Sequence, residues 1–178
     1  MYAAGRLDAD SEGLLLLTNN GRLQQRLTNP RFEHWKTYLV QVEGTPNPEQ
    51  IQRIRSGLMI QGIETLPAQA RWLHSELEPV VAERNPPIRT RQSIATSWLE
   101  LSLQEGKNRQ VRRMTAAVGL PTLRLIRSKI DLMDGDTPLD LTGLKPGEWR
   151  AVNKTEEGRL VQLLKGSNPK NPAGRRRG

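Results

Sequence analysis

Three carboxylates lie in one short loop near the start of the chain, and they are the first residues that could perform catalysis. Asp8, Asp10 and Glu12 fall within residues 5–13, a segment with glycine at both ends that runs directly into four leucines and a threonine. A carboxylate held beside a rigid apolar strand can act as a nucleophile or a proton acceptor. The alternative is an ordinary surface turn, where Asp and Ser are favoured because they bond to nearby backbone. Composition alone does not distinguish the three carboxylates.

A second segment suggests anion binding. Between Gly106 and Lys129 the chain has seven basic residues and no acidic one. Exposed faces usually mix both charges, whereas one sign over this length favours a phosphate-rich ligand, which arginine can bind through two parallel hydrogen bonds. The alternative is a solvated charged face. A helix over 108–118 would bury Val111 and Met114 and place the arginines on its other face. The seven basic residues are Lys107, Arg109, Arg112, Arg113, Arg124, Arg127 and Lys129.

Composition limits the class of protein. The 178 residues suit one domain, and 27 basic against 19 acidic residues give a net charge of +8, which favours nucleic acid or an anionic membrane surface as partner. No apolar run reaches the roughly 18 residues of a membrane span, and the N-terminus has no signal pattern. The absence of cysteine excludes disulfides and thiolate metal sites. With only two histidines, in unrelated settings, we expect no metal site and a cytoplasmic location.

Apolar periodicity and turn signals predict an α+β fold with a mixed, largely antiparallel sheet and flanking helices. Residues 57–62 suggest a tight hairpin, and residues 78–93 a long loop without periodicity. The strand at the leucine run is expected to be buried, and the last helix to be capped by Thr155. Strands are predicted at 14–17, 36–44, 68–74, 94–103, 122–131 and 149–152, and helices at 21–28, 48–56, 108–118 and 155–164.

The end of the chain differs in composition from the rest. Residues 166–178 include Lys170, Arg175, Arg176 and Arg177 and no acidic residue, so they carry half of the net charge. A segment this polar cannot form a core of its own. We therefore predict one catalytic domain over residues 1–165, followed by a basic disordered tail.

Three motifs occur in a fixed order. They are Gly-Arg-Leu-Asp-x4-Gly-Leu-Leu-Leu-Leu-Thr from residue 5, Lys-Thr-Tyr-x-Val-x-Val-Glu-Gly from residue 36, and Glu-Gly-Lys-Asn-Arg-Gln-Val-Arg-Arg-Met from residue 105. Together they closely resemble the RsuA-type pseudouridine synthases, which modify ribosomal RNA. The resemblance covers roughly residues 2–160 and implies the pseudouridine synthase catalytic fold. Within that family the chain is most similar to the short enzymes of the large ribosomal subunit, which favours 23S rRNA as substrate.

The resemblance implies a reaction and assigns residues to it. Members isomerise uridine to pseudouridine in folded RNA with one aspartate and with neither cofactor nor metal. By the motif match, Asp8 is the catalytic aspartate, Tyr38 the ring that stacks on the target base, and Arg112 the partner of the aspartate. Arg6 corresponds to the residue that assists base flipping. Further RNA contacts are expected, mainly to the backbone, from Lys107, Asn108, Arg109, Gln110, Arg113 and Arg127.

The chain departs from the family pattern at its start. Members usually have a strand and an Asn-Lys-Pro-like segment before the first motif, and many have an S4-like RNA-binding domain before that. Here the first motif begins at residue 5, so we expect a member without the S4 domain and with a trimmed N-terminal strand. We also expect a monomer.

Two other functions fit parts of the sequence. A non-catalytic ribosome- or rRNA-binding module of the same fold would share every basic residue and would have no need of Asp8 or Tyr38, so the intact motifs argue against it. A peripheral membrane protein would need a cationic helix with bulky apolar anchors. Residues 108–118 offer only Val, Met and Ala on the apolar side, so this function ranks far behind.

Overall fold

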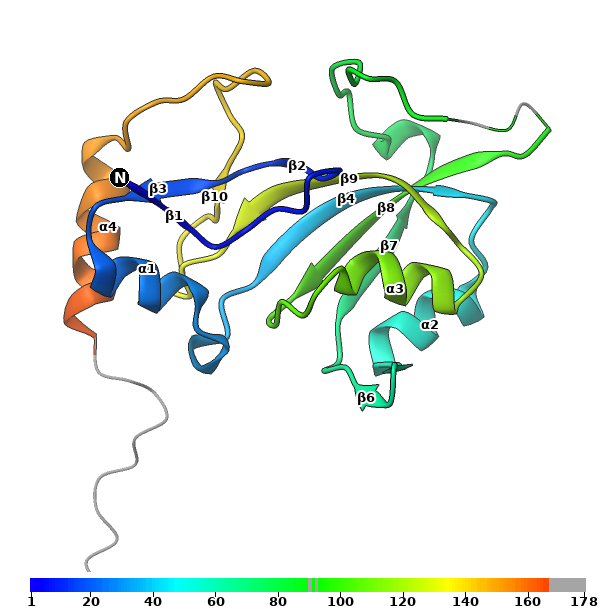
Figure 1. Ribbon diagram of the computed structural model, residues 1–178, viewed down its shortest axis with the longest axis horizontal. Helices are drawn as coiled ribbons and strands as arrows, with labels where there is room; N and C mark the ends of the chain where they lie inside the picture. The colour runs from blue at the N-terminus through cyan, green and yellow to red at the C-terminus, as the bar shows by residue number, and fades with distance from the viewer. Residues whose placement is uncertain (90, 92, 167–178) are drawn as a thin grey trace, which may run out of the picture.

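The computed structural model describes residues 1–166 except residues 90 and 92, and it shows an α+β fold (Figure 1). The elements in chain order are β1 (Tyr2–Ala4), β2 (Glu12–Gly13), β3 (Leu16–Thr18), α1 (Gly21–Thr28), η1 (Pro30–Phe32), β4 (Lys36–Glu43), α2 (Pro48–Ser56), β5 (Met59–Ile60), β6 (Ile63–Glu64), β7 (Gln69–Leu73), η2 (Ser75–Leu77), β8 (Thr96–Leu103), α3 (Gln110–Ala117), β9 (Thr122–Ile130), β10 (Leu139–Asp140) and α4 (Lys154–Lys165). The main sheet of these described residues has the order β10-β9-β4-β8-β7, all antiparallel, and β2 pairs parallel with β9. The predicted mixed, largely antiparallel sheet is confirmed.

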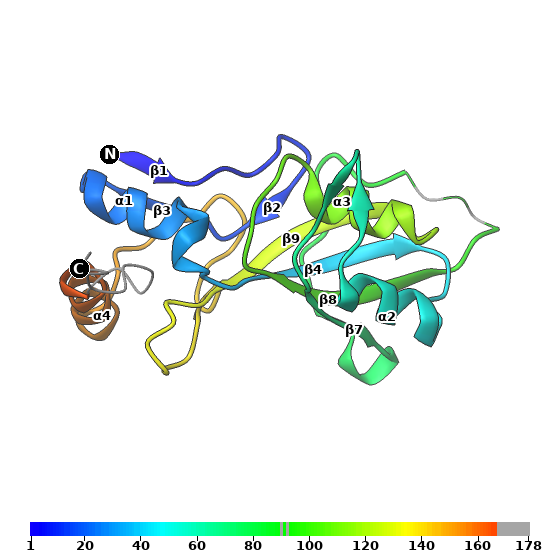
Figure 2. The ribbon, with the colours of Figure 1, turned by 90° about the horizontal axis from the view of Figure 1, so that it is seen from below.

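The main apolar core lies between this sheet and two helices. β4 runs between β8 and β9, and its alternation directs Val40 and Val42, both 0% exposed, toward α2 and α3. Val111 and Met114 of α3 point into the same core, as their helical spacing predicts. Figure 2 shows both helices over the same half of the sheet. The side chains are almost all aliphatic, which fits the low aromatic content of 4%.

A second apolar cluster lies at the opposite end of the molecule (Figure 1). It joins β1, β3, α1 and α4 to the end of β9 and includes Leu27, Ile130 and Leu160. Between the two clusters, the loop that carries Asp8 reaches β9 and pairs with it through β2. The three carboxylates of this loop are therefore placed where the two packed regions meet.

The prediction of a buried strand at the leucine run is only partly correct. Leu14 is buried, but the strand begins at Leu16, and Leu15 and Leu17 are 38% and 54% exposed. Successive side chains of a strand point to opposite faces, and the two-stranded sheet of β1 and β3 is covered by α1 on one face. A continuous apolar run therefore does not mean that both faces are buried.

The C-terminal region contains two further corrections. The expected strand at 149–152 is absent, and Trp149 there is 83% exposed; instead β10 pairs with the end of β9. The cap of α4 is Asn153, not Thr155: its side chain accepts from the Glu156 N–H, and Glu156 bonds back to the Asn153 N–H. A hydrogen bond from Arg150 lowers the pKa of Glu156 to about 2.

Other elements agree with the sequence prediction within about two residues. The helices at 21–28 and 48–56 are confirmed, the second with a capping box formed by Asn47 and Gln50. The hairpin at 57–62 is formed by β5 and β6. Most of the predicted tail, residues 167–178, lies outside the described residues. No helix in the described part of the chain has the length and apolar content needed to cross a membrane.

Candidate active site

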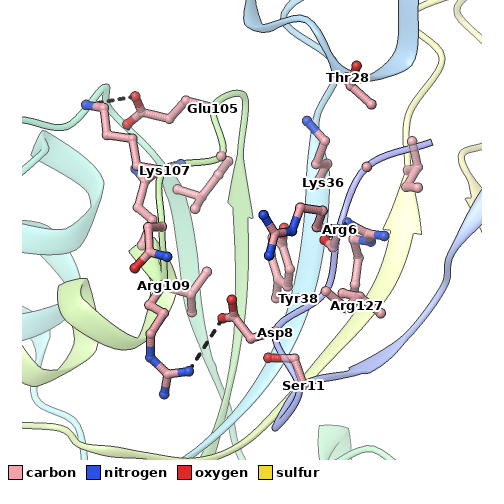
Figure 3. A pocket seen from close by; sticks show the side chains of 18 of the residues that line it. Arg6, Asp8, Ser11, Thr28, Lys36, Tyr38, Glu105, Lys107, Arg109 and Arg127 are labelled. Atoms are coloured by element: carbon pink, nitrogen blue, oxygen red, sulfur yellow. Dashed lines mark hydrogen bonds and ion pairs between the residues drawn. The ribbon is translucent and has the colours of Figure 1, made fainter. Parts of the chain in front are cut away.

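A cleft of about 370 Å³ opens between the two packed regions. One wall is the loop over residues 4–8, and the others come from β4, β9, the segment after β8 and the start of α3. The cleft is lined by five cationic side chains and two carboxylates, so its charge favours an anionic ligand. Its volume lies in the usual range for small-molecule sites and suits a single nucleotide. Figure 3 shows side chains from these separate segments facing one another.

Asp8 is the carboxylate of the N-terminal loop that faces this cleft (Figure 3). Its side chain is 33% exposed, and its Oδ2 atom lies 3.9 Å from Nη1 of Arg109. An ion pair this long and this exposed contributes little energy, so it leaves the carboxylate accessible to a ligand. Asp8 therefore lies near Arg109 without being held by a short hydrogen bond to it.

Asp10 has a different environment, although composition could not separate it from Asp8. It does not line the cleft, and Arg109 donates two hydrogen bonds to its carboxylate, both of 2.9 Å. These bonds, with the charge of nearby Arg112, lower the pKa of Asp10 despite some burial. Asp10 therefore anchors the loop, and of the three loop carboxylates Asp8 is the one that lines the cleft.

Arg112 lies close to the loop but contacts a different residue from the one expected. The prediction paired it with Asp8, whereas its Nη2 donates to the main-chain oxygen of Asp10 at 2.7 Å and to Ser11 Oγ at 3.4 Å. Among the ion pairs of the described residues, Arg112 is joined to Asp10 and not to Asp8. Burial lowers the pKa of Arg112, and Asp10 opposes this shift. Arg112 thus orders the turn that carries Asp8 and does not hold the carboxylate directly.

Two buried arginines of β9 fasten the other side of the loop. Arg124 donates to both oxygens of Glu12, at 2.7 and 2.8 Å. Arg127 donates from Nε to the main-chain oxygen of Leu14, at 2.8 Å, and from Nη1 to that of Arg6, at 3.3 Å. These contacts hold the chain before and after Asp8, so the loop has little freedom to move.

Tyr38 stands on β4 directly opposite Arg127 in the strand register, so both side chains lie on the face of the sheet that lines the cleft. Burial raises the pKa of the Tyr38 hydroxyl, while the neighbouring Arg127 opposes the shift. The hydroxyl therefore stays neutral at physiological pH, and the ring is available as an apolar surface. Exposed Arg6 lines the same cleft, so Asp8, Tyr38 and Arg6, the residues to which the motifs assign roles, lie around one cleft.

The remaining predicted RNA contacts fall into two groups. Lys107, Asn108 and Arg109 are exposed at the rim, and Arg113 is half-buried with a hydrogen bond to Asn108. In contrast, Gln110 is 4% exposed and Arg127 is 3% exposed. Both line the cleft, but Gln110 bonds to Glu105 and to the Lys107 N–H, and Arg127 bonds to the loop, so neither lies on an exposed surface that could follow the RNA backbone.

Sequence reasoning missed two residues of this site. Lys36 lines the cleft two positions before Tyr38, and the two-residue period of a strand could have indicated their common face. Glu105, a buried residue of the segment after β8, accepts from the Leu66 N–H, from Gln110 and from Lys107. Burial alone would raise the pKa of Glu105, but these hydrogen bonds lower it overall. Within the described residues, no group of three or more His, Cys, Asp or Glu side chains could hold a metal ion.

Comparison with known proteins relates this geometry to a family. The family model for RNA pseudouridylate synthase matches residues 1–117. The protein called ribosomal large subunit pseudouridine synthase E from Xanthomonas campestris pv. campestris is 51% identical over 150 residues, covering 84% of this chain and 76% of that protein. The protein of the same name from Vibrio vulnificus is 50% identical over 153 residues, covering 86% of this chain and 62% of its own length.

A solved structure gives the same result for the fold. The crystal structure of a pseudouridylate synthase superposes with a TM-score of 0.70 at 31% identity, covering 90% of this chain and 59% of that one. The chain thus spans about three fifths of the length of two of these proteins. The fold, the motif order and the family match agree, and the chain belongs to the RNA pseudouridylate synthase family.

Proposed function

We propose that this chain isomerises a specific uridine of ribosomal RNA to pseudouridine, with Asp8 as the catalytic carboxylate. The observation that carries the proposal is the difference between the loop carboxylates. Asp8 faces the cleft beside Tyr38, whereas Asp10 and Glu12 are held by arginines. A carboxylate kept open within an otherwise fastened loop is suited to reaction with a bound ligand.

The chemistry needs a group of this kind. The reaction breaks the C1′–N1 bond of uridine, and the electron pair stays with the base while C1′ becomes electron-deficient. A carboxylate can capture or stabilise C1′ until the base rotates and C5 forms the new bond. C5 loses a proton and N1 gains one, so the reaction is balanced without a cofactor or co-reactant. We assign this step to Asp8, the loop carboxylate that lines the cleft, and Arg112 supports it through the Asp10 turn.

The target base must leave its stack to enter the cleft, at a cost of a few kcal/mol. Stacking on an aromatic ring such as Tyr38 recovers about 1–3 kcal/mol of that cost. Exposed Arg6 is free to follow the base or to fill the space that it leaves in the RNA. Lys107, Asn108 and Arg109 at the rim, with Arg113 bonded to Asn108, would contact the RNA backbone, which positions the substrate without reading its sequence.

The relatives' names suggest the substrate. Two proteins of about 50% identity are called ribosomal large subunit pseudouridine synthase E, and we therefore propose 23S rRNA as the substrate. We further propose that the chain acts in the cytoplasm, as a monomer and without a metal or cofactor.

Incubation with 23S and 16S rRNA transcribed in vitro, followed by chemical mapping of pseudouridine, tests the proposal. We expect one modified position in 23S rRNA. Asp8→Asn should abolish modification without weakening RNA binding, because the loss is a nucleophile and not a phosphate contact. The matched control Asp10→Asn should retain most activity, because asparagine can still accept a bond from Arg109. RNA binding without modification by the unaltered chain would favour a non-catalytic rRNA-binding module, and activity in Asp8→Asn would refute the assignment.

A further inference from the structure

Arg127 has a donor that the protein does not use. Its Nε and Nη1 atoms bond to the main chain at Leu14 and Arg6, but Nη2 is buried and has no hydrogen-bond partner among the described residues. The residue is only 3% exposed, so water does not substitute freely for the missing acceptor. A buried, unpaired donor on a charged group is one of the costliest features a fold can keep. Its retention calls for a partner from outside the chain.

The position of Arg127 indicates where that partner would be. It lines the cleft, and it stands directly opposite Tyr38 in the register of β9 and β4. Figure 3 shows the two side chains next to each other, with Asp8 close by. A base stacked on the Tyr38 ring would lie within reach of the guanidinium group, which also interacts with the Tyr38 hydroxyl. Lys36 also lines the cleft, and burial together with the charge of Arg127 lowers its pKa, so two cationic side chains lie near each other in this part of the cleft.

We infer that Nη2 of Arg127 donates a hydrogen bond to a carbonyl oxygen of the flipped uracil and so recognises the base, an inference that rests on the proposed function. Uracil has carbonyl oxygens at C2 and C4, and a carbonyl oxygen is an acceptor that the N–H groups of Nη2 can use. Arg127 is then a specificity-determining residue in the base pocket, in addition to fastening the loop of Asp8.

The same contact would assist the reaction. When the C1′–N1 bond breaks, its electron pair stays on the base, and the negative charge spreads from N1 to the carbonyl oxygens. The guanidinium of Arg127 is buried and fixed by its bonds to the loop, so it can stabilise that charge without having to reorganise. The base stays held until C5 bonds to C1′, after which the proton lost at C5 and the one gained at N1 restore neutrality.

The test separates recognition of the base from support of the loop. Binding of uridine 5′-monophosphate and of ribose 5-phosphate would be measured by NMR titration, since the two ligands differ in the base alone. The variants are Arg127→Gln, Arg127→Lys and a matched control, Arg124→Gln. Arg124 is also a buried arginine of β9 that fastens the same loop, but it does not line the cleft. Melting temperatures of all variants report any loss of folding.

We expect the unaltered chain to prefer uridine monophosphate over ribose 5-phosphate, because the base both stacks on Tyr38 and accepts the Arg127 bond. Arg127→Gln should reduce this preference by about tenfold to a hundredfold, the effect of one hydrogen bond to a charged group. Arg127→Lys should reduce it less, and Arg124→Gln should keep it whole despite a lower melting temperature. Equal loss of preference in Arg124→Gln and Arg127→Gln would overturn the inference, since loop disorder would explain both. Equal weakening of the two ligands by Arg127→Gln would also overturn it and indicate a phosphate contact.

The proposed function can fail independently of this inference. If the unaltered chain forms no pseudouridine in any ribosomal RNA, the proposed function is refuted. A uridine preference that still depends on Arg127 and not on Arg124 would, in that case, support a uracil-binding cleft with Arg127 as its donor.

Discussion

Alanine at Gly13 should damage both the stability of the protein and its active site. Gly13 pairs with Arg127 where β2 meets β9, and its φ is +108°. A Cβ atom built on this backbone would lie 2.3 Å from the main-chain oxygen and 2.6 Å from the nitrogen of Arg127. These neighbours are backbone atoms and cannot rotate away, so β2 would have to move off β9.

The expected loss in the free energy of unfolding has two parts. A non-glycine residue at such a φ costs about 1–2 kcal/mol. Displacing β2 also breaks the bond from the Leu14 N–H to the Arg127 oxygen, 2.7 Å long, and the bond from Arg127 Nε to the Leu14 oxygen, 2.8 Å long. Each broken bond in a buried site costs roughly 1–3 kcal/mol, so we expect a total of about 3–6 kcal/mol after partial relaxation. Asp8, in the same loop, would be misplaced, and the rate should fall at least about tenfold.

Urea denaturation and single-turnover pseudouridine formation at saturating protein would measure the two effects. The matched control is Gly62→Ala, where φ is +75° but no other atom lies within 4 Å of the added Cβ. That variant should lose only the backbone term of about 1–2 kcal/mol and keep its rate. If the free energies of unfolding of the two variants agree within about 1 kcal/mol, β2 can shift at no cost and the argument from close approach is wrong.

Two further predictions concern pH and salt. Burial lowers the pKa of His34 below its ordinary 6.5, so the unfolded chain takes up the proton first. Stability should therefore fall as the pH drops below about 6.5, by at most about 1.4 kcal/mol per pH unit. In urea denaturation at pH 5–7.5, His34→Gln should flatten this dependence of stability on pH. An unchanged slope in that variant would show that His34 is not the group responsible. Deleting residues 167–178, which carry four positive charges, should flatten the salt dependence of RNA affinity by at most about 3–4 log units per log unit of salt and leave the saturated rate unchanged. Loss of that rate would place the tail in the catalytic step.

Local chemistry allowed most of the secondary structure to be predicted. The alternation over residues 36–44 and the cap at Asn47 depend on neighbours within a few positions, so a strand and a helix could be placed from sequence. The ordered motifs likewise located Asp8 and Tyr38, which the structure brings to one cleft. The predictions that failed, such as the strand at 149–152, concerned a segment whose state depends on whether a partner strand is available.

The partners of the charged side chains were decided only by the tertiary structure. The basic segment suggested exposed arginines, yet Arg124 and Arg127 are buried. Arg124 bonds to Glu12 and Arg127 bonds to Leu14, and both partners lie more than a hundred positions earlier in the chain. The same fold ties Asp10 to Arg109 and leaves Asp8 open. The sequence shows the charge of each segment and the spacing of its apolar residues. These determine the helices and strands and show that one loop contains several carboxylates. Which of the carboxylates stays available to a ligand depends on which ones the buried arginines bind. A buried charge needs a partner, and only the folding of the chain brings that partner close in space.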